Sequence, residues 1–204
     1  MDDQQHRMRA PVRVVFKQIM NGDRRKVHAE SNDSDSGGGA RDFRFNHTGL
    51  GPTFAAMFPM RETFIRRRNG QSTQTEVYVG RLVWLRDPAK PEAGTDEMKI
   101  IYEPPTDTRG SEGRIAKVHT YPPFRRYPQE TSGMVLLLLV EDETGVVWSF
   151  YTTQAELKTD KRWNRTLANA ILACIAHTPD HQAAQGTIDL RSGHTYCNAS
   201  DRAR

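Results

Sequence analysis

Two neighbouring apolar runs constrain the fold of this chain more than any other feature. Met134 to Val140 and Val146 to Tyr151 have the length and apolar character of buried strands. The polar segment Glu141 to Gly145 joins them and ends in the glycine that a tight turn requires. The sequence therefore predicts a β-hairpin here, as part of a larger sheet.

Other segments also have strand character. They are β-branched or alternate apolar with polar residues, and they are Val12–Phe16, Phe43–Phe45, Thr75–Val79, Leu82–Leu85 and Met98–Tyr102. Helices are few: Phe54 to Phe58 predicts a short helix closed by Pro59, and apolar residues recur at helical spacing from Asp160 to Ala176, with Asp160 as the cap. Such a sheet must pack against itself or against these helices. The predicted fold class is therefore mainly β, an open or partial barrel with projecting loops.

Composition indicates one domain with polar extensions. The chain has 204 residues, a hydrophobic content of 36% and a mean hydropathy of -0.72, which is low for a compact domain. We expect a single domain over residues 11–178, a flexible basic N-terminus over 1–10 and a flexible C-terminal tail over 179–204.

The cysteines and the hydropathy pattern favour a cytoplasmic protein that does not enter the membrane. Cys174 and Cys197 do not make a disulfide framework, and no signal peptide precedes the first strand-like run. The longest aliphatic run, Val135 to Val140, is far shorter than the roughly 20 residues that cross a bilayer.

The two cysteines and nearby histidines could also form a zinc site, which is a weaker hypothesis. Its candidate ligands are Cys174, His177, His181, His194 and Cys197. Their spacing is loose, and Cys174 lies on the apolar face of the predicted helix, so a core cysteine with tail histidines is the simpler interpretation. We predict no metal and no cofactor.

Two polar segments have the composition of binding loops. Asn21 to Ala40 is predicted to be a long loop, and its glycine-rich part, from Asn32, is unsuited to a helix. Arg109 to Arg126 contains Arg109, Arg114, Lys117, Arg125 and Arg126 together with Tyr121 and Phe124. This mixture suits phosphates, guanine edges and stacked bases. With a net charge of +4 and a pI near 9.2, nucleic acid is the leading partner.

Three groups of residues together resemble a known family. They are Asn32-Asp33-Ser34 with Gly38-Gly39; Thr108-Arg109, Glu112 and Arg114-Ile115; and Thr131 to Val140 with Val147-Trp148 and Tyr151 to Thr153. In this order they resemble the N-terminal effector-DNA-binding domain of EcoRII-type restriction endonucleases, a pseudobarrel shared with a class of plant transcription factors. The resemblance spans roughly Val12 to Gln154 and implies a seven-stranded open pseudobarrel whose two arms grip the major groove of double-stranded DNA.

The resemblance also implies roles for individual residues. Arg109, Glu112 and Arg114 would contact base edges from the second arm. Asn32, Asp33 and Arg41 would contact DNA from the first arm. Gly113 departs from the family's pattern, which has a basic residue there, so the target sequence stays open.

Other basic residues are predicted from their own chemistry to contact phosphates. The full set of predicted DNA-binding residues is Arg24, Arg25, Lys26, Asn32, Asp33, Arg41, Arg109, Glu112, Arg114, Lys117, Arg125 and Arg126. Two alternatives remain open. Glu112 could instead pair with Arg109 or Arg114 on a solvated loop, and Arg66 to Arg68 is either part of the phosphate footprint or an exposed turn.

The main competing hypothesis is that the protein is a small Mg²⁺-dependent nuclease. Glu97-Met98-Lys99 has the Asp/Glu-x-Lys spacing with which many nucleases bind Mg²⁺, but none of Glu76, Asp87 and Glu92 stands out as the further acidic ligand. The resembled enzymes have a separate C-terminal nuclease domain. The resemblance therefore implies a recognition module without a catalytic site of its own, acting alone or with a nuclease on another chain. A barrel domain that binds RNA or protein is a third possibility.

Overall fold

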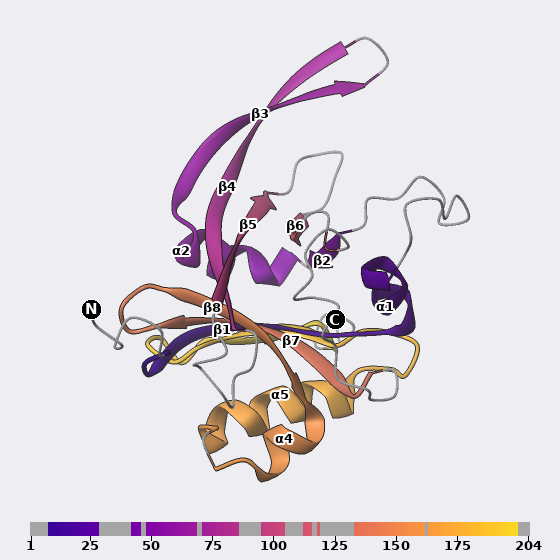
Figure 1. Cartoon of the computed structure of the whole chain (residues 1–204), viewed down its shortest axis with the longest axis vertical. Helices are drawn as coiled ribbons and strands as arrows, with labels where there is room; N and C mark the ends of the chain where they lie inside the picture. Colours follow the sequence, from indigo (N-terminus) through magenta and orange to yellow (C-terminus); the bar gives the residue numbers. More distant parts are fainter. Residues whose placement is uncertain are drawn as a thin grey trace.

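The computed structural model describes residues 8–28, 42–45, 48–68, 71–85, 95–104, 112–115, 118, 133–161 and 163–199. Within these ranges the protein is mainly β: a ten-stranded mixed sheet curls into a half-barrel and carries four α-helices (Figure 1). No helix in the same ranges is long and apolar enough to span a membrane.

The strands follow one continuous order across the sheet, β10-β9-β1-β7-β8-β4-β5-β6-β2, and β3 pairs with β4 off this path. Their bounds are β1 (Pro11–Gln18), β2 (Phe43–Phe45), β3 (Met60–Arg68), β4 (Gln71–Leu85), β5 (Thr95–Glu103), β6 (Glu112–Ile115), β7 (Val135–Asp142), β8 (Val147–Thr153), β9 (Gln185–Asp189) and β10 (Thr195–Cys197). The helices are α1 (Asn21–His28), α2 (Gly51–Met57), α4 (Gln154–Thr159) and α5 (Arg165–His177), and a 3-10 helix, η2 (Thr48–Leu50), precedes α2. Only β4 and β8 pair in parallel among the described strands.

The predicted hairpin is confirmed as β7 and β8. Its turn contains Gly145 with a φ of 82°, which is the left-handed conformation that glycine adopts without strain. The carboxylate of Asp142 accepts hydrogen bonds from the backbone N–H of Thr144 (2.9 Å) and from the indole N–H of Trp148 (2.8 Å). Burial raises the pKa of Asp142, but hydrogen bonds to its carboxylate, chiefly those from the Thr144 hydroxyl and the Trp148 indole, outweigh burial, so its pKa lies below the usual 3.8.

Strands β7 and β8 carry apolar side chains on both faces because both faces of the hairpin are buried. On one face, Leu137 and Leu139 join an inner core together with Val15 of the neighbouring strand β1 and Phe54 of α2. On the other face, Leu136, Leu138 and Phe150 pack under α4 and α5, which lie across the sheet from α2 (Figure 1). A strand buried on both faces loses the alternation of polar and apolar residues.

The helix predicted from Asp160 to Ala176 is confirmed as α5, although α5 begins only at Arg165. Asp160 does not cap this helix but follows α4 as its C-cap residue. The N-cap of α5 is Asn164, whose side chain accepts hydrogen bonds from the backbone N–H groups of Thr166 and Leu167. The helical spacing was therefore correct, but the wrong residue was chosen as the cap.

The polar stretch from Asn21 to Ala40 does not begin as a loop, as predicted, but as helix α1. Its Val27 is completely buried in the inner core. The carboxylate of Asp23 lies 3.1 Å from the Nζ of Lys17 on β1, and both side chains are buried. Burial lowers the pKa of Lys17 below its usual 10.5, although Asp23 acts in the opposite direction. Val27 is the one aliphatic residue in the sequence of this helix, which is too little for a periodic apolar signal.

The C-terminal segment is part of the sheet rather than the predicted flexible tail, at least as far as β10. Strand β9 pairs with β1 over five positions, from Arg13↔Asp189 to Lys17↔Gln185, and β10 pairs with β9. At the other end of the chain, the backbone N–H of Arg9 donates to the carboxylate of Asp142, so residues next to β1 are also attached. β9 was not predicted because Gln185, Gly186 and Thr187 are not apolar and pair with β1, which is far away in the sequence.

A disulfide bond joins Cys174 on α5 to Cys197 on β10. Two cysteines give no pattern from which such a bond can be deduced, and their spacing had favoured a core cysteine with tail histidines. Disulfides are most frequent in oxidising compartments, so this bond adds nothing in favour of the predicted cytoplasmic location.

Candidate nucleic-acid interface

The two segments predicted as binding arms are connected to neighbouring strands of the sheet. Strand β2 follows the first segment, β6 lies within the second, and the two strands pair antiparallel. Their partners are Phe43↔Ile115, Arg44↔Arg114 and Phe45↔Gly113. The fold thus brings together two segments that are far apart in the sequence.

Alternation along β2 and β6 separates apolar from basic side chains. Phe43, Phe45 and Ile115 are completely buried in the inner core. Successive side chains of a strand point to opposite faces, so Arg44 and Arg114 lie side by side on the face away from that core. Both arginines are partly exposed.

Arg114 connects β6 to two other strands. Its Nη2 lies 3.2 Å from Oε1 of Glu103 on β5, whose side chain is only 1% exposed. Its guanidinium also lies over the ring of Phe64 on β3, 5.8 Å from the ring centre. The Nε–H of Arg114 is buried and has no hydrogen-bond partner within the described part of the chain. Arg114, predicted to contact base edges, therefore has structural contacts of its own in the free protein.

Gly113 has a packing reason to be glycine. It lies on the inner face opposite Phe45, and a Cβ at this position would come 3.0 Å from the ring of Phe54. A longer side chain would require that ring to move. This explains in physical terms why no basic residue occupies position 113.

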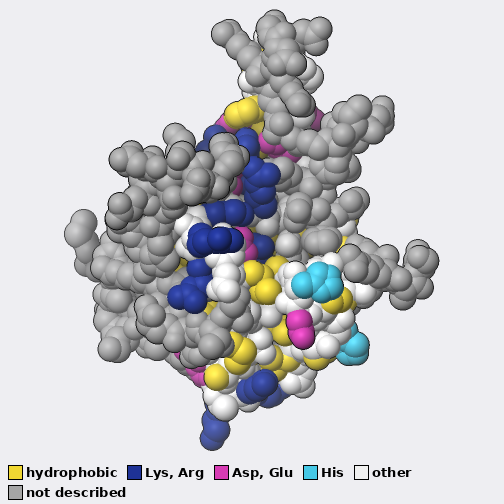
Figure 2. Space-filling view, turned by 90° about the vertical axis from the view of Figure 1, so that its right-hand side faces the viewer, with side chains coloured by type: hydrophobic (Ala, Val, Ile, Leu, Met, Phe, Trp, Pro, Cys, Tyr) yellow, Lys and Arg dark blue, Asp and Glu magenta, His cyan; other side chains and the backbone are white. Residues whose placement is uncertain are grey.

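Helix α1 contributes further positive charge beside this edge of the sheet. Arg25 is exposed, and Lys26 is partly exposed with its Nζ 3.5 Å from Asp23. Arg24 is partly exposed on the same helix. Viewed from the side on which α1 lies, the molecule carries a band of Lys and Arg side chains (Figure 2). Basic side chains from α1, β2 and β6 thus occur on neighbouring elements.

Several predicted site residues lie outside the described residues: Asn32, Asp33, Arg41, Arg109, Lys117, Arg125 and Arg126. For Glu112 the structure gives the backbone alone, as the first residue of β6 and the partner of Glu103. The prediction of a loop from Arg109 to Arg126 is therefore wrong in part, because the segment includes strand β6. Arg44 was not predicted as a site residue, although the Phe43-Arg44-Phe45 alternation was visible in the sequence.

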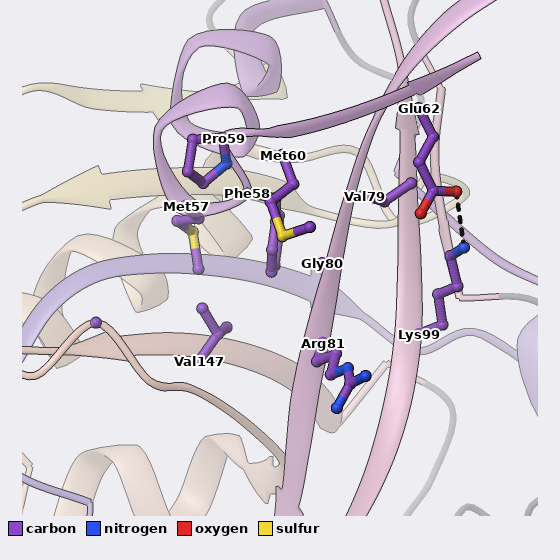
Figure 3. Close-up of a pocket in the computed structure, with 11 residues that line it drawn as sticks. Met57, Phe58, Pro59, Met60, Glu62, Val79, Gly80, Arg81, Lys99 and Val147 are labelled. Carbon is purple, nitrogen blue, oxygen red and sulfur yellow. Dashed lines mark hydrogen bonds and ion pairs between the residues drawn. The ribbon is translucent and has the colours of Figure 1, made fainter.

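A pocket of about 630 Å³ opens where β4 changes neighbours (Figure 3). The pairing of β4 with β3 ends at Val79, and its pairing with β8 begins at Val83. Gly80 lies between them, and a Cβ there would come 2.0 Å from the ring of Phe58. The lining is largely apolar, and the ion pair of Glu62 with Lys99 (3.1 Å) is part of it.

The competing nuclease hypothesis gains nothing from these positions. Lys99 pairs with Glu62, and Glu76 pairs with Arg61 at 2.9 Å. For Glu97 the structure gives only its backbone position opposite Val83, while Asp87 and Glu92 lie outside the described residues. Among the side chains that the structure describes, no group of three or more His, Cys, Asp or Glu could hold a metal ion.

The disulfide leaves the hypothesised zinc site without its two thiolate ligands. Cys174 and Cys197 bond to each other, and a disulfide sulfur is not the thiolate that zinc requires.

No protein-family model and no curated protein matches this chain.

Proposed function

We propose that this protein recognises double-stranded DNA, with the face that carries Arg44 and Arg114 toward the duplex. The observation that carries the proposal is the pairing of β2 with β6, which attaches both predicted arms to adjacent strands. Two arms that start side by side can contact the same stretch of a duplex. In this proposal the half-barrel is a pseudobarrel of the seven-stranded type that the resemblance to EcoRII-type effector-binding domains implies, enlarged by further strands.

The charge distribution supports a nucleic acid as the partner. Arg25 and Lys26 on α1 and Arg44 on β2 place basic side chains at positions suited to phosphates, which fix the position of a protein on DNA. Base-specific contacts would come from the arms, with Arg109, Glu112 and Arg114 as the first candidates. The protein then acts as the recognition component of a restriction-type system, and a nuclease on another chain would supply cleavage.

The experiment that tests this proposal compares two charge reversals. Arg25→Glu lies on α1 at the proposed interface, whereas Arg191→Glu lies in the exposed turn between β9 and β10, at the opposite end of the sheet order. Binding to a fluorescent duplex is titrated at several salt concentrations. Arg25→Glu is expected to weaken binding several-fold and to reduce the salt slope by about 1, because a phosphate contact is lost.

The matched control and the competitors make the result specific. Arg191→Glu should bind as the unaltered protein does, since it makes the same charge change in a turn that carries no predicted DNA-binding residue. Equal weakening by both reversals would show that only the overall charge matters and would contradict the proposed face. Stronger competition by RNA or single strands, or cleavage of plasmid DNA that depends on Mg²⁺, would contradict duplex recognition itself.

A further inference from the structure

Strands β3 and β4 extend beyond the rest of the sheet as a two-stranded ribbon. β3 pairs with β4 along its whole length, from Met60↔Val79 to Arg68↔Gln71. β5 pairs with β4 only from Tyr78 onward. Residues 62–68 and 71–77 therefore pair with each other and with no other described strand, and the ribbon projects away from the body of the molecule (Figure 1).

The outer part of this ribbon is basic and free of carboxylates. From Thr63 to Arg68 and from Gln71 to Thr75 the chain contains three arginines and no Asp or Glu. The remaining polar residues are Thr, Ser and Gln, which donate and accept hydrogen bonds. The carboxylates of the ribbon, Glu62 and Glu76, lie closer to the body, and each pairs with a basic residue.

The ribbon also has exposed apolar side chains that nothing in the described chain covers fully. Ile65 is 58% exposed, and Phe64 is 37% exposed. Because Phe64 contacts the guanidinium of Arg114, the ribbon approaches the β6 strand of the candidate interface. It therefore belongs to the same side of the molecule as that interface.

The charge of the outer ribbon indicates the kind of partner. From Thr63 to Thr75 the three arginines are accompanied by no carboxylate. The arginines favour a polyanion, and the ribbon continues the candidate interface.

We propose that the β3–β4 ribbon enters the major groove of duplex DNA and reads base edges there. This inference rests on the proposed function and adds a third contact to the two arms. The major groove is about 12 Å wide and admits a two-stranded ribbon. Six residues from Thr63 to Arg68 span about 20 Å, more than the groove's depth of about 8.5 Å. Arginine can bind guanine O6 and N7, glutamine can bind adenine, and an apolar side chain such as Ile65 can contact a thymine methyl group.

The test uses a charge-conserving variant of the whole chain, Arg66→Lys combined with Arg67→Lys and Arg68→Lys. Lysine retains the charge but lacks the planar fork that binds a base bidentately. Arg191→Lys, in the turn between β9 and β10, is the matched control. A selected duplex site and a scrambled duplex are titrated with each protein, and protection of guanine N7 from methylation is mapped, because N7 faces the major groove.

The proposal predicts that the triple variant loses discrimination between the two duplexes by about tenfold or more, while its affinity for the scrambled duplex and its salt slope stay unchanged. A subset of protected guanines should also become reactive. Thermal unfolding of the variant verifies that it is folded, and Gln74→Ala, an exposed single change on β4, provides a second variant that should lower discrimination.

Retained discrimination and an unchanged N7 pattern in both variants would overturn the ribbon's role and leave the proposed function intact. If the unaltered protein binds no duplex at all, the proposed function itself fails.

Discussion

Arg114 has structural contacts in addition to its proposed contact with DNA. The sequence suggested a guanine contact, since arginine is the usual partner of guanine O6 and N7. In the structure its guanidinium lies between Glu103 and Phe64. A loss of DNA binding in an Arg114 variant is therefore not by itself evidence for a base contact.

The structural role gives its own prediction. Arg114→Ala should lower the free energy of unfolding by about 2 kcal/mol, because it removes an ion-pair partner of the buried Glu103. Urea denaturation measures this value. Arg114→Lys, which keeps the charge, should lose less. An Arg114→Ala variant as stable as the unaltered protein would show that the pair with Glu103 contributes nothing to the fold.

At the scale of the elements, the C-terminal strands β9 and β10 depend on contacts that are remote in sequence. β9 adds to the free edge of β1, and the Cys174–Cys197 disulfide attaches β10 to α5. The sheet thereby extends to one side of the β7–β8 hairpin, while the candidate interface lies at the other end of the strand order. No predicted DNA-binding residue lies on β9 or β10, so the stability of these strands and DNA binding should be separable.

The disulfide provides the test of this separation. Cys197→Ser should lower the free energy of unfolding by about 3 kcal/mol, because the bond closes a loop with a sequence separation of 23 residues. Dithiothreitol should destabilise the unaltered protein by a similar amount and leave the Cys197→Ser variant unaffected. DNA binding of the folded variant should be unchanged; a large loss of binding at a temperature where it is folded would contradict the separation.

Across these elements, the sequence predicts structure where burial leaves a strong pattern. The β7–β8 hairpin was predictable because Leu136 to Leu139 are buried on both faces, and α5 because its apolar residues follow the helical period. α1 and β9 were missed because few apolar residues hold them: Val27 in one, and Ile188 in the other. β9 is positioned by its pairing with β1, and α1 is linked to β1 by the ion pair of Asp23 with Lys17; no local sequence pattern encodes either contact.

For the whole molecule, the candidate site follows from the curl of the sheet rather than from any single segment. The residue types were visible in the sequence, whereas the neighbourhood of Arg44 and Arg114 depends on the pairing of β2 with β6. The ribbon's relation to that edge depends in turn on the contact between Phe64 and Arg114. Long-range pairing of this kind could not be predicted from composition or spacing.

The assembled face is proposed to recognise duplex DNA by sequence. Selection from a random duplex library with the unaltered protein tests this at about 150 mM salt, where nonspecific phosphate contacts are already weakened. A short motif should be enriched, because arms and ribbon would read base edges. Binding without enrichment, or no binding, would contradict sequence recognition by this face.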